Sequence, residues 1–202
     1  MELSKSPPSI HGVLHLPLAL GLGVMAMTCL SLLAIGNYWL GLVRVQLALD
    51  RCTGETALEL RGRLQSLEST NQKISVLRIS AAGALAAGNL TAFEAIRKTS
   101  NTLARLQDLE LLGWKKTQSK WWLHSTCRGS PPKKPLPEIP FFRTPSDPLG
   151  AKPLEWRESQ PKSFRIILKK GARRSESFVF RSEKTSNSQW TASWRPPDAP
   201  AL

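Results

Sequence analysis

The most prominent hydrophobic pattern is an apolar run from Leu14 to Val43 that contains no Asp, Glu, Lys or Arg. A transmembrane helix needs about 20 apolar residues, so this run is long enough to cross a bilayer. A cleaved signal peptide is the alternative, but its apolar region is shorter and follows a basic segment, whereas Lys5 is the only Lys or Arg before this run. The pattern therefore predicts a retained single-pass transmembrane helix over residues 13–43, in contact with the lipid bilayer, after an N-terminal tail at residues 1–12.

Residues 44–113 carry apolar positions at spacings typical of helix rather than strand. These positions are Leu47, Leu58, Leu60, Leu64, Leu67, Ile74, Leu77 and Ile79. No Pro or turn cluster interrupts the segment before Gly88-Asn89, which predicts a turn there between two antiparallel helices. Each glycine within a helix costs about 1 kcal/mol relative to Ala, so an interruption of the first helix is expected near Cys52–Gly62. We interpret residues 44–113 as a helical stalk or hairpin.

The second helix of this hairpin has recognisable start and stop signals. Thr91 and Glu94 fit a capping box, in which the hydroxyl and the carboxylate bind the first free amides of a helix. Gly113 is the expected stop. The face expected to pack against the first helix contains Ala92, Ile96, Thr99, Leu103 and Leu106.

Two segments of different composition follow the hairpin. In residues 114–128, tryptophans alternate with basic residues, which predicts a first strand region ending near Cys127. Nine of the fifteen prolines lie between Arg128 and Pro161. This composition is typical of a linker, so residues 129–161 are predicted to be a Pro-rich linker or irregular loop.

Residues 162–195 alternate with period two, which indicates short antiparallel strands. The positions predicted to share a face within each strand are Phe164, Ile166 and Leu168, then Phe178 and Phe180, then Trp190, Ala192 and Trp194. Turn residues separate the three runs, and Pro196-Pro197 ends the last one before a C-terminal tail at residues 196–202. The complete pattern predicts an α+β protein: one transmembrane helix continuing into a helical hairpin, then a small antiparallel sheet.

The net charge of +13 lies entirely beyond the apolar run, with 27 basic and 14 acidic residues after Val43. Such a charge favours anionic partners, whether lipid head groups, acidic protein surfaces or nucleic acid. Basic strands with exposed aromatic residues bind single-stranded nucleic acid by stacking and phosphate contact. Because the aromatic residues of 162–195 alternate in register, we expect them on a buried face, and we do not expect nucleic acid as a partner.

No catalytic or cofactor-binding motif is present in the sequence. It has no phosphate-binding loop, dinucleotide fingerprint or zinc-ligand spacing, and no serine in a nucleophile-elbow setting. His124 and Cys127 lie three residues apart but have no further ligands to complete a metal site. We therefore expect no catalytic residue, no metal, no cofactor and no enzyme activity.

The positive-inside tendency and the size of the C-terminal part make opposite predictions about orientation. Four basic residues follow the apolar run closely (Arg44, Arg51, Arg61 and Arg63), against Lys5 before it. This count favours a cytoplasmic C-terminal part, but the rule weakens when a long domain follows the membrane helix. We therefore favour an outward-facing C-terminal part.

The orientation decides the state of the cysteines. Cys29 lies inside the apolar run, whereas Cys52 and Cys127 lie outside it and could pair in an oxidising compartment. A hairpin turning at Gly88 brings the chain back toward Cys52, and the following strand covers the remaining distance at about 3.3 Å per residue. A disulfide between Cys52 and Cys127 is therefore predicted if the domain is exported, with two unpaired thiols as the alternative.

The junction of the apolar run and the first helix carries a resemblance to a known family. The segment Arg44-Val45-Gln46-Leu47-Ala48-Leu49-Asp50, followed by Ala57-Leu58, is similar to the start of TadE/TadG-like membrane-anchored, pilin-like components of the tight-adherence (Flp/Tad) pilus system. The resemblance covers about a third of the chain. The glycine and fifth-position glutamate that precede the apolar span in prepilins are missing, so processing by a prepilin peptidase is not implied.

Membership of that family would imply a bacterial inner-membrane protein with a periplasmic C-terminal domain. Its partners would be other membrane-anchored envelope or pilus subunits, and its role would be structural or in assembly, without enzyme activity. The alternative from a different class is a membrane-tethered basic binding module, with a cytoplasmic domain that contacts nucleic acid or anionic lipid.

Overall fold

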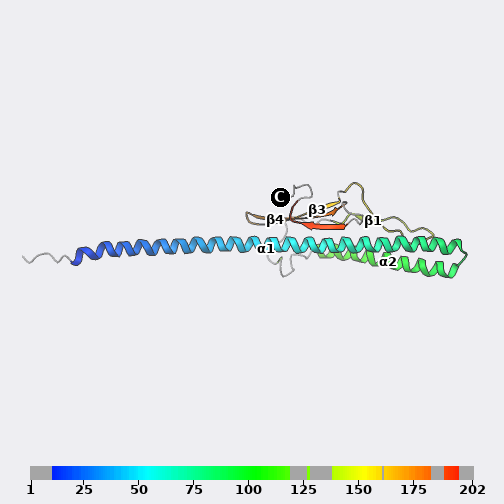
Figure 1. Ribbon diagram of the computed structural model, residues 1–202, viewed down its shortest axis with the longest axis horizontal. Coiled ribbons are helices and arrows are strands. Elements are labelled where there is room, and N and C mark those ends of the chain that lie inside the picture. Colours follow the sequence, from blue (N-terminus) through cyan, green and yellow to red (C-terminus); the bar gives the residue numbers. More distant parts are fainter. Residues whose placement is uncertain (1–10, 119–126, 128–137, 161, 183–188, 196–202) are drawn as a thin grey trace, which may run out of the picture. The chain divides into compact units, whose positions relative to one another are not determined.

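The computed structural model of the protein describes residues 11–118, 127, 138–160, 162–182 and 189–195 (Figure 1). The elements are α1 (His11–Ala86), α2 (Leu90–Gln118), β1 (Phe141–Arg143), β2 (Leu154–Trp156), β3 (Ser163–Lys170), β4 (Arg173–Ser182) and β5 (Gln189–Ser193). The chain divides into two compact units, Met1–Val45 and Gln46–Leu202. Two helices followed by two small antiparallel sheets confirm the predicted α+β class.

The first unit contains the apolar beginning of α1. Among the described residues, this is the one helix with a segment long and apolar enough to cross a membrane. Its large apolar side chains are exposed, as a lipid-facing helix requires. The hydroxyls of Thr28 and Ser31 donate to the carbonyls of Met25 and Met27, each at 2.8 Å. These bonds satisfy the hydroxyls of Thr28 and Ser31 within the helix, which suits a bilayer interior.

The second unit, which we call the folded unit, begins with the remainder of α1. The predicted interruption near Cys52–Gly62 is wrong, because the helix is continuous to Ala86. Five large apolar side chains on one side of α1 are completely buried: Leu49, Leu60, Leu64, Leu67 and Ile74. Burial of this stripe offsets the modest propensity cost of the glycines, which is about 1 kcal/mol each.

The turn between the helices depends on Gly88 and Asn89. Gly88 has a φ of +71° and donates its N–H to Leu85, while the N–H of Asn89 reaches the carbonyl of Ala84 at 2.9 Å. This pair of bonds is a Schellman motif, which ends a helix on a left-handed residue. The side chain of Asn89 then accepts the N–H of Ala92 at 3.0 Å and caps α2. The Gly88-Asn89 turn was predicted correctly.

The predicted start of α2 is wrong in detail, because Asn89 is its cap and the Thr91–Glu94 capping box does not form. Glu94 instead pairs with Arg97 at 2.9 Å. The predicted stop is also wrong, since α2 passes through Gly113 and ends at Gln118. The first strand region was predicted at residues 114–128, but residues 114–118 are helical. Residues 119–126 and 128 lie outside the described part.

The two helices run antiparallel, as Figure 1 shows and as contacts between α1 and α2 establish. Leu67 accepts a hydrogen bond from Gln107 at 2.9 Å, and Ile74 lies in one buried cluster with Ala104. The buried positions of α2 are Phe93, Ser100, Ala104, Gln107 and Trp114. The predicted face was displaced by about one residue, because Thr99 and Leu106 are exposed.

Part of the predicted Pro-rich linker is ordered. Strands β1 and β2 form an antiparallel pair in which Phe141 lies opposite Trp156, and an isolated bridge joins Asp147 to Gly150. Side chains from the helices bind the backbone of this segment. The assignment of residues 138–160 to a linker or irregular loop is therefore corrected, while residues 129–137 lie outside the described part.

The three predicted C-terminal strands are present as an antiparallel sheet in the order β3-β4-β5. In β3, Phe164, Ile166 and Leu168 are buried as predicted. In β4 the predicted face is wrong, because Phe178 and Phe180 are half-buried on the side opposite the buried Ser175, Ser177 and Val179. Trp190 of β5 is buried and lies beside the rings of Phe164 and Trp156, with centroids 5.9 and 5.5 Å away. Trp194 is 56% exposed.

Candidate functional site

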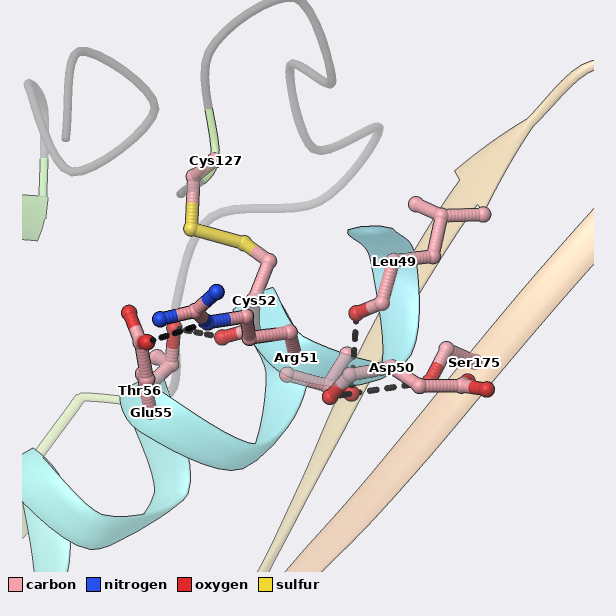
Figure 2. Close-up of a disulfide and its surroundings, with 9 residues drawn as sticks. Leu49, Asp50, Arg51, Cys52, Glu55, Thr56, Cys127 and Ser175 are labelled. Carbon is pink, nitrogen blue, oxygen red and sulfur yellow. Dashed lines mark hydrogen bonds and ion pairs between the residues drawn. A yellow bond between two sulfur atoms is a disulfide. The ribbon is translucent and has the colours of Figure 1, made fainter. Parts of the chain in front are cut away.

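The two cysteines selected from the sequence lie together in the folded unit. Cys52 of α1 and Cys127 are joined by a disulfide, with their Cα atoms 5.1 Å apart and the residues separated by 75 positions in the chain (Figure 2). Both residues are buried, with exposed fractions of 0% and 3%. Cys29, in the first unit, is an exposed free thiol.

The turn of α1 that carries Cys52 also contacts the sheet. The hydroxyls of Thr53 and Ser175 lie 2.8 Å apart in a hydrogen bond, and both residues are buried. Figure 2 shows Ser175 of β4 beside this turn of α1. Small side chains at both positions let helix and strand approach closely, so one turn of α1 is fixed to β4 and, through the disulfide, to Cys127.

Beside this contact is a cavity of about 770 Å³, which we call the edge groove. Its lining includes Asp50 of α1, Arg174, Glu176 and Phe178 of β4, Arg165 of β3, and Trp194. The groove follows the part of β4 that β5 does not cover. Strand β5 pairs with β4 only from Phe178 to Ser182, whereas β3 pairs with it from Arg173 to Phe180.

The direction of the backbone groups along β4 follows from two hydrogen bonds. The N–H of Arg181 donates to Lys162, which precedes β3, so odd-numbered residues of β4 direct their N–H and C=O toward β3. Even-numbered residues point to the opposite edge. In agreement, the carbonyl of Arg174 accepts a hydrogen bond from the Gln46 side chain of α1 at 3.1 Å. Arg174 and Glu176 therefore direct their backbone groups into the edge groove.

The charges of the groove are arranged around Glu176. Its carboxylate pairs with Arg165 at 2.6 Å and also with Arg174. Two guanidinium groups thus share one carboxylate, and both arginine side chains are about half exposed. The Arg165 guanidinium also lies 5.7 Å from the ring centroid of Phe178, within cation–π range. This side of the groove has an excess of positive charge.

Trp194 forms an aromatic wall of the groove against α1. A Cβ placed on Gly54 would lie 2.8 Å from the Trp194 ring, so the ring packs closely over the glycine. On the same helix, Asp50 accepts a hydrogen bond from Gln46 at 2.9 Å. None of these groove residues was predicted from the sequence to belong to a site. The available signal was Pro196-Pro197, which stops β5 before it covers the beginning of β4.

A second polar cluster fixes the loop between β1 and β2 to α1. Arg78 binds Asp147 through two nitrogens, at 3.0 and 2.6 Å, and the carbonyl of Gly150 at 3.0 Å. The hydrogen bond from Arg78 has the largest effect and lowers the pKa of Asp147 below its ordinary value of 3.8. Burial opposes this shift, and the Arg78 charge lowers the pKa further. The cluster is paired and has a structural role.

Several large apolar side chains of the helical hairpin are exposed. On α1, Leu58 and Val76 are 58% and 61% exposed and lie 18 residues apart, which is five helical turns and places them on one face. On α2, Leu106, Leu109 and Leu112 are each more than half exposed. We call these five residues the hairpin apolar positions. Exposed apolar side chains of this kind provide apolar surface for packing against another protein.

Within the described residues, no group of three His, Cys, Asp or Glu side chains is placed to hold a metal ion. The expectations of no catalytic residue and no cofactor stay predictions. Comparison with protein families, with curated proteins and with solved structures finds no match to this chain.

Proposed function

We propose that this protein is a single-pass, membrane-anchored structural or assembly component of a bacterial pilus or secretion-type envelope system, of the TadE/TadG-like kind. The observation that carries the proposal is α1, which contains both an uncharged segment able to cross a membrane and an amphipathic part that forms the folded unit. A membrane anchor continued by a packed helix suits a subunit whose neighbours are anchored in the same way.

The proposed location is the bacterial inner membrane, with the folded unit in the periplasm. The buried disulfide between Cys52 and Cys127 supports this orientation, because structural disulfides persist in oxidising compartments and are rare in the cytosol. The positive-inside count favours the opposite orientation, but it has less weight when a long domain follows the anchor.

The proposed partners are other membrane-anchored envelope or pilus subunits, which would pack on the hairpin apolar positions. Burial of one such side chain contributes about 1.5–3 kcal/mol, so a few of them suffice for a lasting contact between proteins already held in one membrane. The role requires no enzyme chemistry and no cofactor.

Orientation is tested by fusing alkaline phosphatase or a fluorescent protein to Leu202. The proposal expects phosphatase activity in intact bacterial cells, because the reporter folds only after export. Fluorescence from a cytosolic reporter together with inactive phosphatase would place the folded unit in the cytoplasm and overturn the proposed location.

The assembly role is tested by isolating the tagged full chain from membranes of its own bacterium and identifying the proteins that accompany it. Leu58→Lys or Val76→Lys should lower the recovery of membrane-anchored subunits about tenfold, because a lysine must then be buried at the contact. Ser159→Lys, at an exposed position after β2, adds the same charge and should change nothing. Equal recovery with all three variants would reject the hairpin contact.

The alternative function is a basic module that binds nucleic acid, and one observation favours it. Phe178 and Phe180 were predicted to be buried, but they are half-buried on the outward face of β4, and Arg165 lies over the Phe178 ring. Binding of this kind weakens steeply as salt rises, because phosphate contacts release counterions. No shift of a labelled single-stranded oligonucleotide at low salt would reject this alternative.

A further inference from the structure

The edge groove leaves part of a sheet edge uncovered. Among the described strands, only β3 pairs with β4 at residues 174–176. The backbone groups of Arg174 and Glu176 point into the groove. Gln46 of α1 binds the Arg174 carbonyl at 3.1 Å, so an added strand would pair through the Arg174 N–H and through the N–H and C=O of Glu176. An uncovered strand edge of this kind is a template for another extended chain, which adds through backbone hydrogen bonds.

After β5 the described chain bends at Trp194 and Arg195. Continuing the register of β5 would place Arg195 opposite Glu176. Instead, Trp194 and Arg195 form a bend in which the Arg195 N–H donates to the Ser193 hydroxyl at 3.1 Å. The next two residues are prolines, which have no N–H to donate to a strand partner. The sequence thus ends β5 before it reaches the beginning of β4.

The walls of the groove define the chemistry of a suitable occupant. On the outward side, Arg165 and Arg174 share the single carboxylate of Glu176, which leaves positive charge for an acidic side chain. On the side of α1, the indole of Trp194 offers an apolar surface, and the Asp50 carboxylate, which accepts a hydrogen bond from Gln46, also lines the groove. Alternate side chains of a strand face opposite sides of a sheet, so an added strand would present acidic and apolar residues in alternation.

We infer that the edge groove binds a short extended segment of a partner protein, which pairs with β4 at Arg174–Glu176 in line with β5. The segment has alternating acidic and apolar residues, with acidic side chains beside Arg165 and Arg174 and apolar side chains beside Trp194. At about 3.3 Å per residue, the uncovered edge accommodates about three residues of such a strand. The inference rests on the proposed function only for the source of the segment, a neighbouring envelope subunit.

The test uses the full chain in a non-ionic detergent and the fluorescein-labelled peptide Val-Glu-Val-Glu-Val, followed by fluorescence anisotropy. The matched control has the same side chains but N-methyl groups on the amides of one edge, so its charge is unchanged and its pairing is blocked. We expect the unmodified peptide to bind about tenfold more tightly, because two backbone hydrogen bonds are lost in the control. A second control, Val-Lys-Val-Lys-Val, should bind at least as weakly.

Variants locate the binding on the protein. Trp194→Ala and Arg174→Glu should each weaken binding of the acidic peptide about tenfold, whereas Arg105→Glu, at an exposed position of α2, removes the same positive charge elsewhere and should leave binding unchanged. Loss of binding in the two groove variants together with retention in Arg105→Glu supports the inference. Two groove variants are used so that a folding defect in one does not decide the result.

Four outcomes overturn the inference. Equal binding of the N-methylated peptide would mean adsorption by charge alone, and unchanged binding in both groove variants would place the peptide elsewhere. Tenfold tighter binding after removal of residues 196–202 would make the chain's own tail the occupant. Dissociation of a dimer of this chain by the peptide would make a second copy the occupant. Because the assay contains no partner subunit, its failure leaves the membrane isolation test standing, and the reverse also holds.

Discussion

Asn71 of α1 binds the backbone of Leu154 in β2 twice. Its Nδ2 donates to the Leu154 carbonyl and its Oδ1 accepts the Leu154 N–H, both at 2.7 Å. The side-chain amide thus takes the place of a peptide group on a neighbouring strand. The same Oδ1 also accepts a hydrogen bond from Gln107 of α2 at 3.0 Å. One side chain therefore joins both helices to the small β1-β2 sheet.

Replacing Asn71 should destabilise the folded unit. Asn71→Leu leaves the N–H and C=O of Leu154 without these partners, so we expect a loss of about 2 kcal/mol or more in the free energy of unfolding. Asn71→Asp retains the acceptor and removes the donor, and it should have an intermediate effect. Urea unfolding in detergent measures both, with the exposed neighbour Gln72→Ala as a control expected within about 0.5 kcal/mol of the wild type. Equal stability of Asn71→Leu and Gln72→Ala would contradict this account.

Removing the disulfide should also lower stability. Cys52 and Cys127 close a loop of 75 positions, for which the chain-entropy relation gives about 4 kcal/mol. The double variant Cys52→Ser/Cys127→Ser should therefore unfold at much lower urea concentration, and reductant should shift the wild type but not the variant. Thiol labelling of denatured protein taken from cells checks the bond directly. Full labelling of both cysteines without prior reduction would show that the bond is absent.

Two Gly→Ala changes should have opposite signs. Gly88 has a φ of +71°, and nothing lies within 4 Å of an added Cβ, so Gly88→Ala should cost about 1–2 kcal/mol through backbone strain alone. Gly62 is within α1, and an added Cβ there also meets open space, so Gly62→Ala should stabilise the helix by up to about 1 kcal/mol. Gly88→Asn should cost less than Gly88→Ala. Thermal unfolding that shifts both alanine variants in the same direction would contradict the turn assignment.

The ion pair between Arg78 and Asp147 should make stability depend on pH in acid. The folded pKa of Asp147 is lowered below 3.8, so its contribution is fully present above that pH and is lost as the pH falls through the lower folded pKa. Asp147→Asn should therefore have a lower melting temperature than the wild type at pH 6, and the difference should shrink below about pH 4. Glu158→Gln, at an exposed position, should show no such trend. A difference that is constant from pH 6 to pH 2 would contradict the pairing.

Strands could be predicted from the sequence where apolar residues alternate because every second side chain is buried. Strands β3 and β5 were found because Phe164 and Trp190 lie on the buried face of an alternating pattern. The face of β4 was assigned wrongly because close approach to α1 requires the small Ser175, which leaves Phe178 on the outward side. Hydrophobicity cannot distinguish these arrangements when the packing partner demands small residues.

Other errors have a different cause, since they depend on tertiary contacts. Strands β1 and β2 have only three residues each among many prolines, and they are held by side chains such as Asn71 and Arg143. The Arg143 guanidinium reaches the Ala104 carbonyl at 3.1 Å and Gln107 at 2.9 Å. No local pattern in the sequence predicts such long-range contacts. Likewise α2 continues past Gly113 because Trp114 is buried beside Arg63, which outweighs a small propensity cost.

The edge groove could not be predicted from the sequence, because it results from the difference in length between β4 and β5. Only the register shows that β5 stops at Ser193, opposite Phe178, while β4 continues to Arg173. The candidate cysteine pair was accessible because just two cysteines lie outside the apolar segment. A pairing between few candidates can be selected from the sequence, whereas a cavity formed by three elements cannot.

The disulfide gives the chain a second covalent route. Along the backbone, the sheets connect to the membrane segment through the whole hairpin, but the bond from Cys52 to Cys127 bypasses the part of the hairpin that follows Cys52. A protease that cuts once at the Gly88-Asn89 turn would therefore release nothing, and the fragments would separate on a gel only after reduction. A cut in this turn therefore leaves the C-terminal sheets covalently attached to the membrane segment.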